Sequence, residues 1–473
     1  MLGGRGEMEV WSVRLPSAHT PLQRPSDVSC SVHNVIAVTV EGSGNTYNFA
    51  IVNPCDPTHP ILVTTTHASP LVALCFPKYG TAHDLLSVDS SGRCILWGMQ
   101  RRCLSVWQPI AEMELRIQPL VVRSLYFGNM ILRRVNECDE APPMASYVSP
   151  NPIRFSGSSF LCPLVAYVVV GSTSVFLLWK DTSSTRVNML PVALSDHTIL
   201  VADACLLSGG FLAVAFQDES HASHEFQVFS YSVTLNPDHE SMMCEFQSFV
   251  RVVDHCEGST LSSLSLTAVG TDLHCLVESC DSSNDGTLTL LNINFLEGTA
   301  SLRSSAQVPV TGCAIPSVPG TQRRSVGKIV VSPEGYQVAI LPHLDNEPVR
   351  ILNGISLQCV ATLPLPADGS SSGEPPLKRA NVKTQEEAPD SLQGEQPHST
   401  NGSLCFSHNG AAIVVLDASS FCHWFPAMLF EEPEELLSTA ANMVMHCVWK
   451  PAGDAFDIAS LFLHWPDLDP SLW

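Results

Sequence analysis

The residues of this chain that could perform chemistry are few and widely separated. His221 and His224 lie three residues apart, as zinc ligands can, but no cysteine or carboxylate completes the three or four ligands that zinc requires. The segment Gly42-Ser43-Gly44 has the small residues of a phosphate-binding loop, but no helix is expected after it. We therefore predict no metal site and no cofactor.

The sequence also lacks the common motifs of hydrolytic and nucleotide chemistry. It contains no P-loop, no G-x-S-x-G nucleophile elbow and no H-E-x-x-H zinc motif. The prediction is a protein that is not an enzyme and has no catalytic residues.

Two aspartates occur at turns between apolar segments, which favours a structural role for them over acid–base chemistry. Asp89 begins the segment Asp89-Ser90-Ser91-Gly92, where its carboxylate can accept hydrogen bonds from the backbone of the turn. Gly92 tolerates the left-handed conformation that such a turn uses. Asp417 has the same setting near the other end of the chain.

The segments around Asp89 have the pattern of a propeller blade. Strands are expected at Val72–Phe76, Asp84–Val88 and Arg93–Trp97, with a further strand at Cys103–Trp107. A D-x-x-G hairpin followed by a strand ending in tryptophan is typical of a WD40 blade, although glycine follows Trp97 here. A single blade cannot bury both of its faces, so the rest of the chain should supply more blades.

A second unit of the same kind is legible near the end of the chain. Its strands are expected at Ser403–Phe406, Ala411–Leu416 and Phe421–Phe425, with Gly410 in the first turn and Asp417 in the second. Trp424 lies seven residues after Asp417, and Trp97 lies eight residues after Asp89. The similar offset indicates one repeated unit, in which both tryptophans belong to the core.

Alternating strands and turns fill the chain between these two units. The expected strands are Val28–Val40 (a pair), Thr46–Val52, Leu120–Leu132, Val165–Val170, Val175–Leu178, Phe211–Phe216, Phe226–Val233, Leu261–Leu266, Leu273–Glu278, Thr287–Ile293, Ile329–Val331, Tyr336–Leu341, Val349–Leu352 and Gln358–Leu363. They predict an all-β fold, a WD40-like β-propeller over residues 28–425 with seven blades of four strands.

Three regions are expected to differ from the blades. Residues 1–27 are predicted to be irregular, and residues 366–400, rich in Pro, Ser, Gly, Gln and Glu, to be a disordered insertion. Residues 426–473 are predicted to begin a helical region, because acidic residues precede apolar ones at three- and four-residue steps. Leu436 and Leu437 lie on the apolar face of the first helix, where a partner could bind.

Bulk composition limits the class of protein. The net charge of −22 disfavours a general nucleic-acid binder, and no sequence-specific nucleic-acid binding is expected. The 17 cysteines include no C-x-x-C pair, which is typical of reduced thiols in an intracellular protein. No apolar signal segment is apparent at the N-terminus.

One uncharged segment could in principle cross a membrane. Phe155 to Trp179 contains no charged residue, but Pro163 and the polar run Gly171-Ser172-Thr173-Ser174 interrupt it. The interruption favours two strands of a buried hairpin, and no membrane association is expected.

Several of these stretches together resemble the family of Mediator complex subunit 16, a tail-module subunit of the RNA polymerase II co-activator. The stretches are SCSVHNVIAVTV, DLLSVDSSGRCILW, GGFLAVAF, RILNGISLQCVATL with the insert EPPLKRANVK after it, and FDIASLFLHWPDLDPSLW. The resemblance implies a non-enzymatic scaffold in the nucleus, a transcription co-regulator whose partners are other tail subunits and transcription activators. Family members extend further, so the chain resembles an N-terminal portion or a shortened form.

Two other classes remain open on the sequence. A generic WD40 adaptor outside transcription would show the same repeats, since fold does not imply function. A propeller enzyme would place ionisable or metal-binding side chains around the central channel, and no such ring can be assembled from the sequence. Lys378 and Arg379, with Lys383, are either a weak nuclear-import signal or part of a solvated linker.

Overall fold

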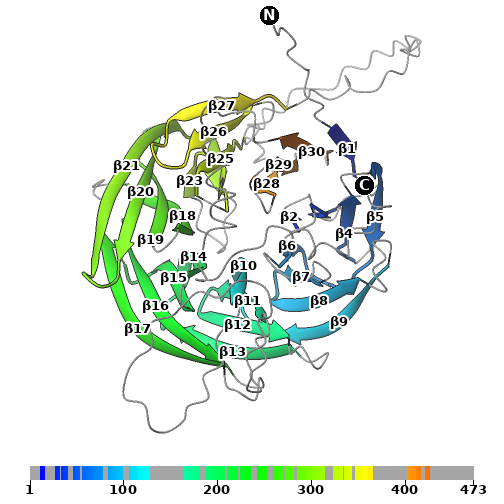
Figure 1. The fold of residues 1–473 in the computed structure, drawn as a ribbon, viewed down its shortest axis with the longest axis horizontal. Helices are drawn as coiled ribbons and strands as arrows, with labels where there is room; N and C mark the ends of the chain where they lie inside the picture. The colour runs from blue at the N-terminus through cyan, green and yellow to red at the C-terminus, as the bar shows by residue number, and fades with distance from the viewer. Residues whose placement is uncertain are drawn as a thin grey trace, which may run out of the picture.

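The chain folds into a closed ring of β-sheets. The computed structural model describes residues 11–15, 27–31, 34–40, 46–53, 56–77, 84–99, 106–127, 164–180, 187–207, 210–221, 224–235, 242–253, 259–269, 272–281, 285–314, 323–333, 335–343, 347–365, 402–407, 410, 412–416 and 421–426. These residues form strands β1 to β30 and no helix. Seven four-stranded antiparallel sheets are arranged as blades around a common centre (Figure 1), so the predicted seven-bladed, all-β propeller is confirmed.

The four strands of each blade run from the centre of the ring outward. Blade 1 is β2 (Val28–Cys30), β3 (Ile36–Thr39), β4 (Phe49–Asn53) and β5 (Asp56–Val63). Blade 2 is β6 (Leu71–Cys75), β7 (Asp84–Asp89), β8 (Arg93–Met99) and β9 (Trp107–Glu114). Blade 3 is β10 (Pro119–Phe127), β11 (Leu164–Gly171), β12 (Ser174–Lys180) and β13 (Val187–Leu194).

The second half of the ring repeats this order. Blade 4 is β14 (Ile199–Leu207), β15 (Phe211–Asp218), β16 (Glu225–Leu235) and β17 (Met242–Val253). Blade 5 is β18 (Thr260–Val269), β19 (Asp272–Cys280), β20 (Asp285–Asn294) and β21 (Thr299–Pro309). Blade 6 is β24 (Lys328–Val331), β25 (Gln337–Leu341), β26 (Val349–Asn353) and β27 (Cys359–Leu363). The short pair β22 (Gly312–Ala314) and β23 (Arg323–Ser325) lies between blades 5 and 6 in the chain.

Blade 7 closes the ring with strands from the two ends of the described chain. Its inner three strands are β28 (Ser403–Phe406), β29 (Ala412–Leu416) and β30 (Phe421–Pro426), and its outer strand is β1 (Trp11–Arg14). The prediction that residues 1–27 are irregular is therefore wrong for β1. Four residues are too few for a sequence signal, and β1 exists because it pairs with the edge of β30.

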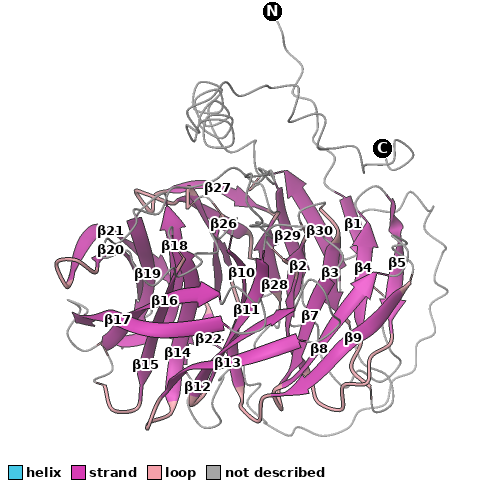
Figure 2. Cartoon of the chain, turned by 60° about the horizontal axis from the view of Figure 1, so that its bottom comes forward, coloured by secondary structure: helices cyan, strands magenta, loops and turns pink. Residues whose placement is uncertain are grey.

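The hydrophobic core consists of seven clusters, one between each pair of neighbouring blades. Middle strands are buried on both faces, as in β7 and β29, because each blade is covered by a neighbour on either side. Outer strands such as β9 and β21 have almost no buried residue and run along the outside of the ring (Figure 2).

Bulges recur at matching places in the blades. The pairing of the third strand with the outer strand shifts register once in each of blades 1 to 6. The inner pair of blades 2 to 5 shifts near its start, where Val72, Leu120, Leu200 and Ser262 are skipped. Because a bulge adds twist to a strand pair, this repetition gives successive blades a common shape.

Some sequence expectations fall outside the described residues. They include the insertion at 366–400, Lys378 and Arg379, and the helical region with Leu436 and Leu437. The described part of the uncharged segment that raised the membrane question, from Leu164 on, forms β11 and β12, which pair with each other and confirm the hairpin. Among the described residues, no helix is long and apolar enough to span a membrane.

Candidate functional site

A chain of buried polar side chains holds the hairpin of blade 2 to the preceding link. His67 lies between blades 1 and 2, and its Nδ1 is 2.9 Å from Asp89 Oδ2. Its Nε2 is 2.8 Å from Ser87 Oγ, and Trp97 Nε1–H donates to the same Oγ at 2.8 Å. All four side chains are buried. Ser87 Oγ also lies 3.4 Å from the Ile95 carbonyl oxygen, so this hydroxyl joins His67, Trp97 and the backbone of β8.

Asp89 occupies the turn role that the sequence predicts for it. Its Oδ1 accepts hydrogen bonds from the backbone N–H groups of Ser91 and Arg93 and from the Ser91 hydroxyl. Burial raises the pKa of the Asp89 carboxyl, but hydrogen bonds from His67, Ser91 and Arg93 outweigh burial and hold this pKa below its usual value. Asp89 is therefore a fully engaged carboxylate of the blade.

Gly92 has the left-handed conformation expected of it, with a φ of 86°. A Cβ at this position would lie 2.4 Å from the carbonyl oxygen of Ile117, in the link to blade 3. The Gly92 carbonyl in turn accepts a hydrogen bond from the Leu115 backbone N–H. The absence of a side chain thus lets the turn touch the next link of the chain.

The proposed equivalence of Trp97 and Trp424 is wrong. Trp97 is 3% exposed, pairs with Leu85 and packs toward blade 1, where Phe49 meets its ring edge-on at 5.4 Å. The residue of blade 7 that packs toward the preceding blade is Phe425, also 3% exposed, and it pairs with Ile413. Trp424 is only partly buried and faces blade 1 on the other side of the sheet. Offsets of seven and eight residues differ by one, and one residue reverses the face of a strand.

The other candidate positions at the end of the chain are less completely described. Gly410 has a φ of 68° in the turn between β28 and β29, as expected. Asp417 lies outside the described residues, as do Leu436 and Leu437. The predicted equivalence of Asp417 to Asp89 as a turn residue and the predicted partner-facing helix therefore stay predictions.

Asp218 of blade 4 occupies the position that Asp89 has in blade 2, and the sequence analysis did not identify it. Asp218 ends β15 as Asp89 ends β7, and each opposes the first residue of its inner strand. Asp218 Oδ1 accepts hydrogen bonds from the backbone and hydroxyl of Ser220, at 2.9 and 2.5 Å. His221 Nδ1 lies 2.7 Å from the same oxygen, so this histidine belongs to a turn. No group of three metal-ligating side chains occurs among the described residues.

Asp27 connects the inner strands of several blades. Its Oδ2 accepts a hydrogen bond from the Leu74 N–H of blade 2 at 2.8 Å. Its Oδ1 lies 3.4 Å from Lys328 Nζ of blade 6, which donates to Ser403 Oγ of blade 7 at 2.8 Å. One carboxylate just before β2 thus links the inner strands on both sides of the point where the ring closes.

A second acidic residue does the same for blades 3, 4 and 5. Asp203 of β14 accepts hydrogen bonds from Arg123 Nε at 2.9 Å and from the Leu266 N–H at 2.8 Å. The Asp203 charge raises the pKa of the Arg123 guanidinium, and Asp27 adds a smaller contribution. The charged side chains of the inner strands therefore serve as ties between blades.

Glu278 of β19 is a buried carboxyl. Val326 N–H donates to its Oε1 at 2.6 Å and Ser263 Oγ donates to its Oε2 at 2.8 Å. Burial raises the pKa of Glu278 to about 7, and these hydrogen bonds offset only part of that effect. The carboxyl fastens the chain after β23 to blade 5.

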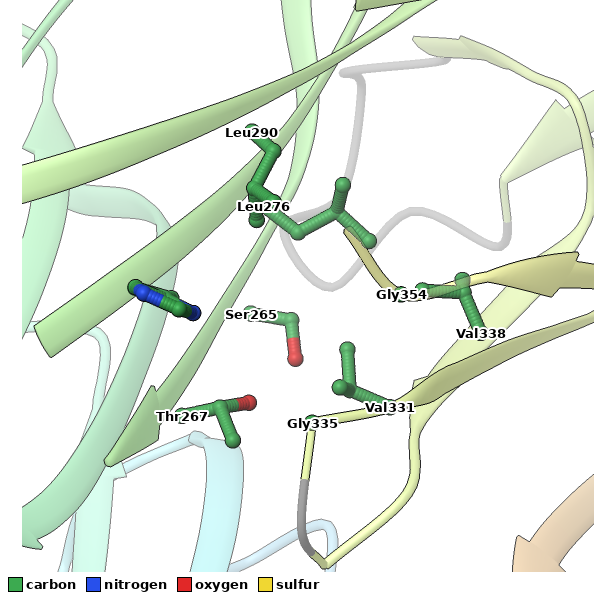
Figure 3. A pocket seen from close by; sticks show the side chains of 9 residues that line it. Ser265, Thr267, Leu276, Leu290, Val331, Gly335, Val338 and Gly354 are labelled. Atoms are coloured by element: carbon green, nitrogen blue, oxygen red, sulfur yellow. The ribbon is translucent and has the colours of Figure 1, made fainter. Parts of the chain in front are cut away.

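A small hollow lies between blades 5 and 6 (Figure 3). It is lined by Ser265, Thr267, His274, Leu276, Leu290, Val331, Gly335, Val338 and Gly354. His274 Nε2 lies 2.5 Å from Arg303 Nη1, and burial followed by the Arg303 charge lowers the pKa of His274. The hollow has room for about one water molecule, too little for a substrate.

The described surface carries large apolar side chains on the outer strands. They are Leu62, Met189, Met243, Phe246, Phe249, Val253, Leu302 and Val360. The two phenylalanines lie together on β17, each within ring-contact distance of Phe229. Sequence reasoning missed them because it did not predict β17. The segment MMCEFQSFVRVV contains many apolar residues, which could have indicated a strand. Its two phenylalanines are three residues apart, a spacing that differs from the two-residue alternation of a regular strand.

Comparison with known proteins gives likenesses of fold alone. No protein-family model and no curated protein matches the sequence. Raptor from Chaetomium thermophilum has a TM-score of 0.48 and 10% identity, with a match that covers 88% of this chain and 29% of the Raptor chain. Sqt1 from Chaetomium thermophilum, solved with the N-terminus of ribosomal protein L10, has a TM-score of 0.44 and 14% identity, covering 85% of this chain and 97% of Sqt1.

Proposed function

We propose that the chain is a non-enzymatic scaffold that binds protein partners. The observation that carries this proposal is the set of large apolar side chains exposed on the outer strands, such as Phe246, Phe249 and Leu302. Clustered exposed apolar residues mark interaction surfaces, and aromatic residues are enriched in protein interfaces. The acidic side chains of Asp27 and Asp203, by contrast, are engaged in contacts between inner strands.

At a finer level, we propose that the partners belong to the Mediator tail module and that the chain acts in the nucleus as a transcription co-regulator. The support is the resemblance to Mediator complex subunit 16. Four stretches that carry it fall on blade strands: on β2 and β3, on β7 and β8, on β15, and on β26 and β27. Transcription activators would then be further partners.

The test is to tag the endogenous protein and identify what co-purifies from nuclear extract. Tail-module subunits should be recovered reproducibly and in amounts comparable to the tagged protein, and the tagged protein should be nuclear by microscopy. Recovery of other assemblies without any Mediator subunit would leave a WD40 adaptor that acts outside transcription.

A further inference from the structure

We infer that Cys30 and Cys405 form a reversible disulfide that locks the propeller covalently at the junction where its ring closes. Cys30 lies on β2, the inner strand of blade 1, and Cys405 lies on β28, the inner strand of blade 7. A bond between these strands would close a loop of chain that runs around the whole ring. It is independent of the proposed scaffold function.

Both side chains face the junction between blades 7 and 1. Cys30 and Val28 belong to the face of β2 that packs on the core cluster of this junction. Cys405 packs on the same cluster from β28, while Leu404 and Phe406 on either side of it face blade 6. The strands β2 and β28 are themselves in contact. The two thiols therefore enter one interface from its opposite sides.

The next junction shows how closely the facing residues of neighbouring inner strands approach. Ser29 faces blade 2, and its hydroxyl accepts a hydrogen bond from the Phe76 backbone N–H at 3.1 Å. Asp27 faces the same way, and its carboxylate accepts from the Leu74 N–H at 2.8 Å. Short side chains of one inner strand thus reach the backbone of the next.

Cys405 and Cys30 occupy the positions that Ser29 and Phe76 have at that next junction. Cys405 and Ser29 each lie two residues before a serine whose backbone N–H donates across the turn into the second strand. Cys30 and Phe76 each lie near the end of an inner strand on the face toward the preceding blade. The equivalence places Cys405 Sγ beside the backbone of Cys30. A disulfide requires such closeness, because it joins Cα atoms only about 4.4–6.8 Å apart.

The surroundings of the two thiols allow a slow oxidation. Both side chains are partly buried, whereas Cys422 in the same cluster is fully buried. Burial raises the pKa of the Cys405 thiol well above its usual value, and Cys30 is the neighbour that adds most to this effect. Cys405 is therefore a protonated thiol at neutral pH. Because the thiolate is the reactive form, the bond should need sustained oxidation.

A hydroperoxide supplies the oxidising equivalents. One thiol sulfur attacks a peroxide oxygen, the O–O bond breaks, and a sulfenic acid and one water form. The second sulfur attacks the sulfenic sulfur, so that the S–S bond forms while the S–O bond breaks. The hydroxide that leaves takes the second thiol proton and becomes water. Two thiols and one hydrogen peroxide thus yield one disulfide and two waters, and a dithiol reverses the bond by exchange.

Oxidation would add a covalent closure to the pairing of β1 with β30. The cross-linked loop would run from residue 30 to residue 405, and a long loop restricts the unfolded chain strongly. The oxidised chain should therefore melt about 5 °C above the reduced chain.

The experiment treats the full chain with hydrogen peroxide, blocks the remaining thiols with N-ethylmaleimide in denaturant, and identifies linked peptides by mass spectrometry. A pair of peptides joined through Cys30 and Cys405 should appear, and dithiothreitol should remove it. The melting temperature should rise on oxidation and return on reduction. Recovery of both cysteines in separate peptides, alkylated or oxidised to sulfinic acid, would overturn the inference.

Variants separate this bond from general oxidation. C30S and C405S should each lose the linked peptide and the rise in melting temperature, with each variant compared to its own reduced form. C359S is the matched control, because Cys359 is exposed on β27, and it should keep both. A rise in C405S equal to that of wild type would contradict the bond.

A second cysteine pair serves as a control within the same sample. Cys205 and Cys275 share the core cluster between blades 4 and 5, and both are buried. The oxidant should not reach them, so both should be recovered alkylated. Linkage of this pair in place of Cys30 and Cys405 would also overturn the inference. The Mediator proposal is tested separately, because co-purification measures partners and not the state of these thiols.

Discussion

Gly92 combines two requirements at a single residue, a left-handed backbone and contact with the carbonyl of Ile117. Gly92→Ala should therefore be strained in its backbone and also displace the link to blade 3. Gly298→Ala is the matched control, because Gly298 has a φ of 66° with nothing within 4 Å of a Cβ. We expect the control to lose about 1 kcal/mol of unfolding free energy and Gly92→Ala about 2–4 kcal/mol, measured by urea denaturation. Equal losses of unfolding free energy for the two variants would show that the segment around Ile117 can move away from a Cβ at position 92 without cost.

Trp97 stabilises blade 2 through both packing and one hydrogen bond. Trp97→Ala should cost about 3–5 kcal/mol, because a buried ring is lost and a cavity remains. Trp97→Phe and Ser87→Ala, combined in a double-mutant cycle, isolate the hydrogen bond between Nε1 and Oγ. The coupling free energy should be about 0.5–1.5 kcal/mol, and a value of zero would contradict a stabilising bond.

Glu278 should make stability depend on pH in the opposite sense to a paired carboxylate. Its folded-state pKa of about 7 lies above the usual 4.5, so the folded protein holds this proton more tightly than the unfolded chain. The contribution is fully present below pH 4.5 and is lost as pH rises through 7, a change of about 3 kcal/mol. Glu278→Gln should remove this dependence from unfolding curves recorded between pH 4.5 and pH 8.

The control for this measurement is Glu245→Gln, which alters an exposed carboxylate of blade 4. It should keep the wild-type pH dependence. Parallel curves for wild type and Glu278→Gln would mean that Glu278 ionises in the folded state as it does in solution.

At the level of the element, burial explains many of the strands that the sequence revealed, although the inner strand β14 was missed and the exposed outer strand β27 was predicted. β7 and β8 were predicted to within two residues, because both faces are buried and the sequence is a nearly continuous apolar run. The outer strands β5, β13, β17 and β21 were missed. In β21, Ser, Thr, Arg and Gln fill exposed positions, and pairing with β20 makes it a strand.

Blade 2 shows the same limit in its fourth strand. Cys103–Trp107 was expected, but the strand is Trp107–Glu114, and residues 101–105 lie outside the described part of the chain. The segment contains Pro109 and two glutamates, which lower strand propensity but are tolerated at an exposed edge. Hydrogen-bond partners that are distant in sequence could not be predicted either. His67 contacts Asp89, but no local sequence pattern relates a residue between two blades to a turn within a blade.

The strands of blade 7 allow a test of which face each aromatic residue uses. Phe425→Ala should cost about 3–5 kcal/mol because its ring is buried between blades 6 and 7. Trp424→Ala should cost about 1–2 kcal/mol less, since its ring is only partly buried. Chemical denaturation of both variants provides the measurement, and the reverse order would restore Trp424 as the counterpart of Trp97.

At the scale of the whole molecule, stability depends on closing the ring. β1 covers the edge of β30, and Val13 and Leu15 enter the core cluster between blades 7 and 1. Deleting residues 1–15 should therefore lower the unfolding free energy by about 3–5 kcal/mol and make blade 7 sensitive to protease. Deleting residues 1–10, which leaves β1 in place, is the control. Identical melting of the two truncated proteins would show that closure does not need β1.

The pairing of β1 with β30 also gives the molecule the topology of a circle cut at one place. Trp11 lies opposite Trp424, so the start of the first strand is beside the end of the last. A short hairpin loop could join them, and the chain could then begin at any of the links between blades. No blade is first in the physical sense. A circular permutation would change only the point at which the chain begins and ends. The seven core clusters between neighbouring blades would keep the same residues.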